Sequence, residues 1–206
     1  MGNRRGAEEA LAFQTIHYVG FPLSVSETFQ QRNTNKSIAQ AFDEVDLIQQ
    51  CCLQAGRELV VYLSMGFGNP YGDPYSPELV AEFSNRLAQM GVRIIAPSDT
   101  VGSSTPEAIE SLFRLLIAQF PQIEFGAHLH TRPGEAAGKV RAAIRAGVGR
   151  IDGALRGFGG CPMAADELTG NLPTEEIIQT LTLEGLALPI HPEAFQRAMT
   201  LSAGVF

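Results

Sequence analysis

Short runs of strand-forming residues recur along the chain, and this repetition constrains the fold more than any other feature. The runs begin at residues 16, 58, 93, 125 and 150, so the successive spacings are 42, 35, 32 and 25 residues. Several runs lack regular polar alternation, which is typical of parallel strands covered by helices. Spacings of this size are those of repeated βα units. The five predicted strands are Ile16–Gly20, Glu58–Leu63, Arg93–Ala96, Phe125–Leu129 and Arg150–Ala154.

The segments between these runs carry helix signals. Ser76 and Thr105 each precede a proline and a glutamate, which predicts an N-cap followed by proline at the first helical position. Gly91 and Gly147 lie where helices are expected to end. No linker, low-complexity tract or run of charge divides the chain. We therefore expect residues 1–206 to form a single α/β domain.

Composition and charge exclude several function classes. The 206 residues include 22 acidic and 15 basic side chains, a net charge of −7, whereas nucleic-acid-binding proteins present a basic face. No apolar run approaches the roughly 18 residues that a membrane helix needs. The start of the chain lacks the apolar core of a signal peptide, and the three cysteines form no disulfide framework. We expect a cytoplasmic protein with free thiols that binds neither nucleic acid nor membranes.

Two architectures arrange parallel strands in this pattern, an open doubly wound sheet and a (β/α)8 barrel. Five βα repeats are too few for a complete barrel, which typically takes about 250 residues. The candidate catalytic residues lie at or after the carboxyl ends of the predicted strands, where both folds place their sites. The pattern alone therefore leaves both architectures open.

His128 and His130 lie at the end of the fourth predicted strand. Residues two apart in a strand point to the same face, so the two imidazoles can offer two nitrogen donors to one divalent cation. The alternative is one histidine in the core and one at the surface. Because the chain has only four histidines, two of them at one strand end favour the metal site.

A glycine-rich loop follows the last predicted strand, and Gly157–Pro162 has the sequence Gly-Phe-Gly-Gly-Cys-Pro. Three glycines and a proline give the backbone unusual freedom before a stiff exit, so the thiol of Cys161 could reach into a site and be withdrawn. A glycine-rich turn with an incidental cysteine is the alternative. Cys51 and Cys52 lie in the helical stretch Ile38–Ala55 and are interpreted as core packing.

Asn171 and Asp99 are two further candidates. Asn171 lies shortly before Thr174, which we expect to be the N-cap of the next helix, and an amide oxygen is an acceptable ligand for a hard cation. A turn-forming asparagine is the alternative. Asp99 closes the third predicted strand, where its carboxylate either polarises a substrate hydroxyl or caps the following turn.

In this order the motifs resemble those of the 3-hydroxy-3-methylglutaryl-CoA lyases, within a wider family of metal-dependent lyases and Claisen-condensing barrel enzymes. The His-x-His pair is shared across the wider family, whereas the Gly-Gly-Cys-Pro loop followed by Gly-Asn-Leu is specific to the lyases and disfavours a synthase. The resemblance implies an incomplete (β/α)8 TIM barrel that retains about the last five βα units. It covers nearly the whole chain and rests on Glu27–Asn33, Ser98–Gly102, His128–His130, Gly157–Pro162 and Gly170–Glu175.

The resemblance implies a retro-Claisen cleavage of 3-hydroxy-3-methylglutaryl-CoA to acetyl-CoA and acetoacetate, with Mg²⁺ or Mn²⁺ as cofactor. His128, His130 and Asn171 would bind the divalent cation, which would acidify the tertiary hydroxyl of the substrate. Cys161 would act as an acid or base on a loop that closes over the site, and Asp99 would lie beside the hydroxyl.

By the same resemblance, Arg32 and Asn33 would contact the CoA moiety of the acyl-CoA substrate. The chain departs from the family pattern at Leu129 and Thr131, where members usually have Cys and Asp. The first three βα units, which carry an Arg-Asp pair with an acidic metal ligand, have no counterpart, so we expect an N-terminally truncated barrel. Five strands without the other three leave two unpaired sheet edges, so we expect a homo-oligomer. The second hypothesis is a catalytically incompetent fragment, active only in a longer product or with a partner.

Overall fold

Five parallel strands form the inner layer of the fold and follow one another in chain order. The structure is a computed structural model, and it describes residues 2–160 and 169–205. The sequential order β1-β2-β3-β4-β5 confirms the predicted incomplete (β/α)8 barrel, because a doubly wound sheet reverses its strand order. A sixth strand pairs antiparallel with the end of β4. The strands are β1 Tyr18–Ser24, β2 Glu58–Ser64, β3 Ile94–Asp99, β4 Glu124–Thr131, β5 Arg150–Ile151 and β6 Gly170–Asn171.

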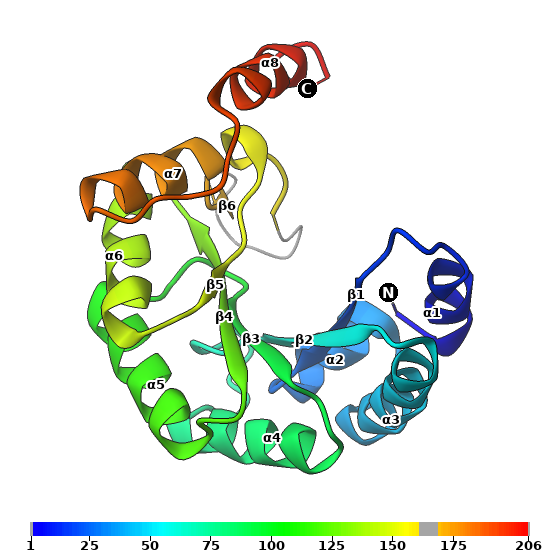
Figure 1. The fold of residues 1–206 in the computed structure, drawn as a ribbon. Coiled ribbons are helices and arrows are strands. Elements are labelled where there is room, and N and C mark those ends of the chain that lie inside the picture. Colours follow the sequence, from blue (N-terminus) through cyan, green and yellow to red (C-terminus); the bar gives the residue numbers. More distant parts are fainter. Residues whose placement is uncertain (1, 161–168, 206) are drawn as a thin grey trace.

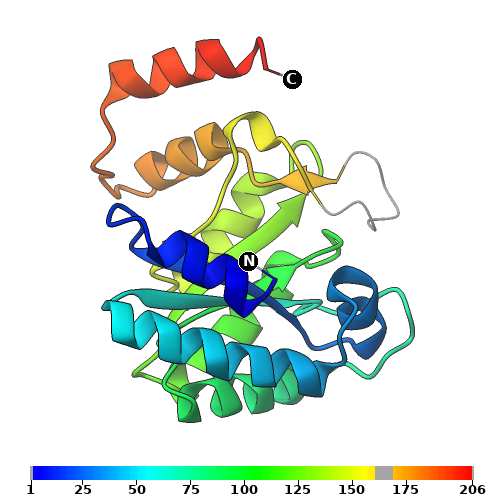
Figure 2. The same cartoon turned by 90° about the vertical axis from the view of Figure 1, so that its right-hand side faces the viewer.

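Helices surround the strands as an outer arc that is open on one side (Figure 1). After a quarter turn, α8 in red lies at the opposite end of the structure from α3 in cyan (Figure 2). Within the described ranges, no helix combines the length and apolar character needed to cross a membrane. The helices are α1 Arg4–Leu11, α2 Glu27–Thr34, α3 Ile38–Ala55, α4 Pro77–Gln89, α5 Pro106–Gln119, α6 Ala136–Ala146, α7 Thr174–Leu183 and α8 Pro192–Ser202, with the 3-10 turn η1 Leu155–Gly157.

The predicted helix caps explain where several of these helices begin and end. The hydroxyls of Ser76 and Thr105 accept hydrogen bonds from backbone amides in the first turns of α4 and α5, each with proline at the first helical position. Gly147 ends α6 with a φ of +92°, a left-handed conformation that glycine adopts without strain. The prediction for α7 is wrong by one residue, because Pro173 occupies the N-cap and Thr174 is the first helical residue.

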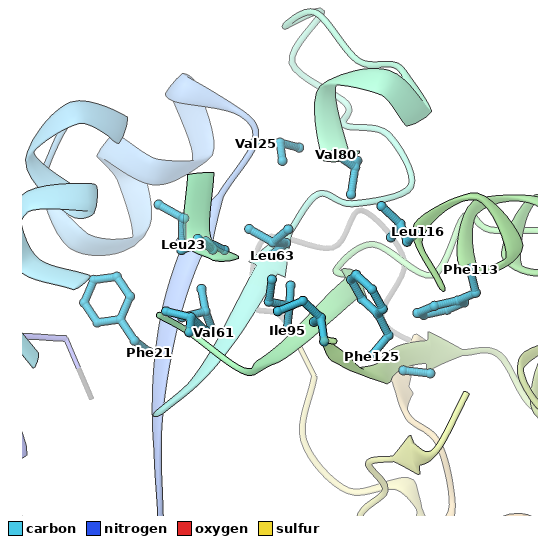
Figure 3. Packing of buried hydrophobic residues seen from close by; sticks show 14 of the residues in the cluster. Phe21, Leu23, Val25, Val61, Leu63, Val80, Ile95, Phe113, Leu116 and Phe125 are labelled. Atoms are coloured by element: carbon cyan, nitrogen blue, oxygen red, sulfur yellow. The ribbon is translucent and has the colours of Figure 1, made fainter. Parts of the chain in front are cut away.

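The main core lies between the outer face of the strands and the helices (Figure 3). Leu23, Leu63 and Ile95 point outward from successive strands and are fully or almost fully buried against helix residues such as Phe113 and Leu116. The opposite face of the same strands points into the barrel, because side chains alternate along a strand. A smaller interior cluster there contains Val60, Ile94 and Ala96. The outer face of the strands therefore packs against the helices, and the inner face is available to form a site.

All five strands differ from their predicted bounds by one to four residues at an end, and the first and the fifth do so for identifiable reasons. The first begins later than expected and continues through Pro22, which a strand tolerates at a sheet edge because proline lacks an N–H donor. In the described part of the chain, β1 pairs only with β2. The fifth is shorter than expected, because the backbone at Ala154 leaves β4 and bonds to Leu172 and Thr174 instead.

Candidate active site

The carboxyl ends of the strands surround a cavity of about 270 Å³. Residues two apart along a strand face it, as the alternation of side chains requires. Barrels of this kind hold their active sites at this end of the strands. The lining residues are Gly20, Pro22, Tyr62, Ser64, Ser98, Thr100, His128 and His130.

The structure brings together the three residues predicted to bind a cation. His128 and His130 both lie on the cavity side of β4, with their ring centroids 5.5 Å apart. Asn171 lies in β6, whose antiparallel pairing with β4 sets it opposite His130. Residues opposite each other in such a pair project from the same face of the sheet. The pairing of β6 therefore carries the amide from a distant part of the sequence to the two imidazoles.

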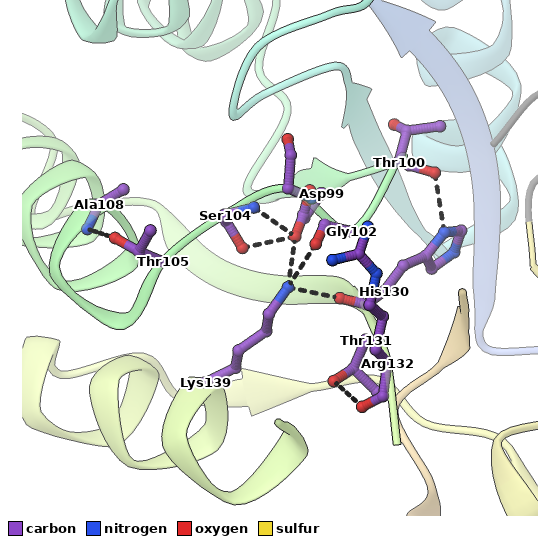
Figure 4. Close-up of polar contacts among 11 residues, drawn as sticks. Asp99, Thr100, Gly102, Ser104, Thr105, Ala108, His130, Thr131, Arg132 and Lys139 are labelled. Atoms are coloured by element: carbon purple, nitrogen blue, oxygen red, sulfur yellow. Dashed lines mark hydrogen bonds and ion pairs between the residues drawn. The ribbon is translucent and has the colours of Figure 1, made fainter. Parts of the chain in front are cut away.

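His130 is held in one tautomer by the backbone. Its Nδ1 lies 2.9 Å from the carbonyl oxygen of Thr100 (Figure 4). Because a carbonyl only accepts, Nδ1 carries the proton and Nε2 keeps its lone pair. Burial lowers the pKa of His130, and the neighbouring His128 lowers this pKa further. The ring therefore stays in the neutral, cation-binding form to a lower pH than a free imidazole does.

Two polar residues flank His128, one in β2 and one directly after β5. Its Nδ1 is 3.3 Å from Oδ2 of Asp152, and the ring of Tyr62 packs edge-on with a centroid separation of 5.2 Å. Asp152 also lies close enough to Tyr62 for its carboxylate to influence the phenol. Burial, followed by the negative charge of Asp152, raises the pKa of Tyr62 to about 12. The phenol therefore stays protonated.

Asn171 is positioned by the glycine-rich loop. Its Nδ2 donates to the carbonyl of Phe158 at 2.8 Å, which leaves the amide oxygen as the atom suited to a cation. Gly157 has a φ of +68°, and a Cβ there would lie 2.9 Å from the backbone oxygen of Asn171. The backbone N–H of Asn171 donates to the carbonyl of Gly159 at 3.1 Å. The glycines predicted to give this loop its backbone freedom allow it to pack closely against β6.

The donor atoms of this site are of the kinds that bind divalent cations. Two neutral imidazole nitrogens and one amide oxygen are accepted ligands for first-row divalent metals. Within residues 2–160 and 169–205, no group of three or more His, Cys, Asp and Glu side chains is arranged to hold a metal ion. None of the three donors is a carboxylate, so this set by itself does not balance the charge of a bound cation.

The structure does not bring Asp99 into the cavity, although the resemblance placed it beside the substrate hydroxyl. Ser98 and Thr100 line the cavity, so the residue between them points toward the helices. The Asp99 carboxylate accepts from Nζ of Lys139 at 2.8 Å and from the amides of Ser103 and Ser104 (Figure 4). Of the two interpretations of Asp99, the structure supports the one in which it holds the following turn.

The remaining predicted residues lie apart from the cavity or outside the described residues. Arg32 and Asn33 are exposed on α2, which follows the carboxyl end of β1, and the guanidinium of Arg32 stacks 4.8 Å from the ring centroid of Tyr71. Their contact with CoA stays a prediction. Cys161 lies outside the described residues, and its role also stays a prediction. Cys52 is fully buried and burial raises its pKa to about 11, which agrees with core packing.

Sequence reasoning missed Tyr62 in β2 and Asp152 directly after β5, both of which contact His128. Tyr62 lies two residues before Ser64, at the end of the second predicted strand, so its cavity-facing position follows from the period of two. Asp152 lies within the predicted fifth strand, and the available signal was a charged residue between apolar neighbours. Neither residue type in isolation distinguishes a site from a surface.

Strand order, cavity position and the histidine–asparagine set define an incomplete (β/α)8 barrel with imidazole and amide donors at the carboxyl ends of its strands. The chain belongs to the HMGL-like family, whose model matches residues 3–202. It is therefore lyase-like by family.

Several relatives of known sequence and structure are HMG-CoA lyases. The mitochondrial hydroxymethylglutaryl-CoA lyase of Rattus norvegicus is 33% identical over 184 residues, which cover 89% of this chain and 56% of the relative. A Bacillus subtilis HMG-CoA lyase structure superposes with a TM-score of 0.88 at 30% identity, covering 97% of this chain and 66% of that one. The Acinetobacter baumannii HMG-CoA lyase in complex with coenzyme A and 3-methylmalate has a TM-score of 0.85 at 26% identity, covering 98% and 66%. The chain thus spans little more than half the length of the curated relative.

Proposed function

We infer that this chain supplies the cation-binding half of a 3-hydroxy-3-methylglutaryl-CoA lyase barrel. The reaction removes the proton of the C3 hydroxyl, breaks the bond between C2 and C3, and releases acetoacetate and the enolate of acetyl-CoA, which is then protonated. The observation that carries the proposal is the convergence of His128, His130 and Asn171 at the barrel mouth through β4 and its pairing with β6. Membership of the HMGL-like family supports the choice of reaction.

His128, His130 and Asn171 would hold the divalent cation, Mg²⁺ or Mn²⁺. When bound, the cation supplies Lewis acidity that lowers the pKa of the substrate hydroxyl. The protein's own contribution is to hold its donors in the right form. Thr100 fixes the proton of His130 on Nδ1, and the loop carbonyl of Phe158 fixes the orientation of the Asn171 amide.

Cys161 would protonate the leaving enolate carbon, and Arg32 and Asn33 would contact the CoA moiety. The glycine-rich segment before Cys161 packs against β6, so the backbone that leads to the thiol begins beside Asn171. A relative crystallised with coenzyme A supports an acyl-CoA as the substrate class. We propose a cytoplasmic location for the reaction.

Two observations favour the second hypothesis, in which catalysis needs a longer product, a partner chain or a second copy. In the described part of the chain, β1 pairs only with β2, and β5 forms its strand ladder only with β4. The candidate donor set also contains no carboxylate. Both features are expected if further βα units complete the barrel and the cation's charge balance.

The direct test is release of acetoacetate from 3-hydroxy-3-methylglutaryl-CoA by the purified chain in the presence of Mn²⁺, with its molecular mass in solution measured in parallel. Turnover that is lost in His130→Ala supports the lyase. A folded chain without turnover that becomes active when further βα units of the family are added supports the second hypothesis. A folded chain that stays inactive in both forms would contradict the proposed reaction.

A further inference from the structure

The two histidines of the site are oriented by different partners. His130 directs Nδ1 at the backbone carbonyl of Thr100, at 2.9 Å. His128 directs Nδ1 at a side chain, Oδ2 of Asp152, at 3.3 Å. Asp152 is thus the acidic side chain that contacts a candidate cation ligand, and the proposed reaction assigns it no task.

The backbone places Asp152 beside His128 independently of their side-chain contact. β5 is parallel to β4, with Ala127 paired to Ile151, and the amide of Asp152 donates to the carbonyl of Ala127 at 3.0 Å. The register between β4 and β5 therefore places Asp152 beside His128. Tyr62, from β2, packs its ring edge-on against the same imidazole, with a centroid separation of 5.2 Å.

The chemistry of this contact determines which nitrogen of His128 faces the site. An ionised carboxylate only accepts hydrogen bonds, so in the neutral ring the proton lies on Nδ1. The lone pair is then on Nε2, the nitrogen on the far side of the ring from Asp152. Histidines that bind metals commonly donate their other N–H to a carboxylate or carbonyl in this way. The same geometry excludes Asp152 as a ligand alongside Nε2 of that ring.

The geometry points to Asp152 as the positioning residue of the site, which holds His128 in the Nδ1–H tautomer with Nε2 presented to a divalent cation. This inference deepens the proposed function and rests on it for the identity of the ligand. The edge-on contact with the ring of Tyr62 also limits the rotation of the His128 imidazole. His130 needs no such side chain, since the backbone at Thr100 serves the same purpose.

The test compares the two imidazoles in the metal-free chain by long-range ¹H–¹⁵N NMR at pH ~8.5, about two units above the pKa of free imidazole. In the unaltered chain both rings should show the Nδ1–H tautomer. In Asp152→Ala, His128 should shift toward the Nε2–H form that predominates in free imidazole, while His130 should stay unchanged and serve as an internal reference. Asp152→Asn, which is close in volume, should shift His128 in the same direction by a smaller amount. Asp46→Ala, on the exposed face of α3, is the matched control.

Calorimetric titration with Mn²⁺ gives the second measurement. Asp152→Ala should weaken binding about 10- to 100-fold, the usual loss when the partner of a metal-binding histidine is removed. An unchanged His128 tautomer in both Asp152 variants, or an equal change at both histidines, would overturn the inference. If the unaltered chain binds no Mn²⁺, the proposed function fails, and the tautomer comparison still decides the role of Asp152.

Discussion

Replacement of Lys139 by methionine should destabilise the fold, because this lysine is a buried charge that links three segments around the site. Its side chain is 2% exposed, and Nζ donates to Oδ2 of Asp99 at 2.8 Å, to the carbonyl of His130 at 2.8 Å and to the carbonyl of Gly102 at 3.1 Å. Methionine fills most of the volume of the lysine stem, so the change removes the charge and its three bonds with little cavity.

The expected loss in the free energy of unfolding is about 3 kcal/mol. Removing one partner of a buried ion pair costs about 3–5 kcal/mol, mainly because the other charge is left uncompensated. Asp99 keeps its hydrogen bonds from the amides of Ser103 and Ser104 and from the Ser104 hydroxyl, which places the loss at the lower end. Such a loss is a large fraction of the roughly 5–15 kcal/mol that stabilises a typical domain.

Urea unfolding followed by circular dichroism measures this loss directly. The double variant Lys139→Met with Asp99→Asn should lose less than the sum of the two single losses, by at least about 0.5–1 kcal/mol, because removing both charges leaves none unpaired. A loss below about 1 kcal/mol for Lys139→Met, with an unchanged dependence on urea concentration, would refute the reasoning. Additive losses would show that the two charges do not interact.

Three further predictions concern the loop and the titration of the site. In whichever form of the protein cleaves the substrate, the chain alone or the chain extended by further βα units, Cys161→Ser should lower turnover by orders of magnitude with folding intact. Near-normal turnover would remove the thiol from the mechanism. Gly157→Ala should destabilise the chain more than Gly185→Ala in urea unfolding, because both have positive φ but only the first has a backbone atom within 3 Å of the new Cβ. The pKa of His130, read by NMR, should lie below about 6.5. The unfolded chain then binds the proton more readily, so the His130 contribution to stability is present above about pH 6.5 and is lost as the pH falls toward the folded pKa.

The sequence was sufficient for the parts of the fold that depend on local pattern. The spacing of the strand runs predicts the parallel strands, and the Ser76 and Thr105 caps predict where two helices begin. His128 and His130 share a face because side chains alternate in a strand, whatever the rest of the chain does. The same rule, applied to the segment around Asp99, would have placed its carboxylate on the helix side.

What the sequence did not predict depends on pairings between distant segments. The two residues of β6 carry no strand signal of their own, and they adopt that conformation by pairing with the end of β4. The position of Asn171 opposite His130 follows from this register alone. Asp152 contacts His128 because β5 is in a particular register with β4, which a single sequence does not reveal. The family resemblance identified Asn171, while the contacts of Tyr62 and Asp152 with His128 depend on the three-dimensional arrangement of the strands.

Titration of the purified chain with Mn²⁺ by calorimetry tests the central claim most directly, with circular dichroism to confirm that the chain is folded. The convergence of His128, His130 and Asn171 predicts one saturable site in the micromolar range, which is lost in His128→Ala and in His130→Ala but kept in His191→Ala, whose ring lies at the start of α8. A folded chain with no saturable site, or with binding that survives both substitutions in β4, would contradict the assignment.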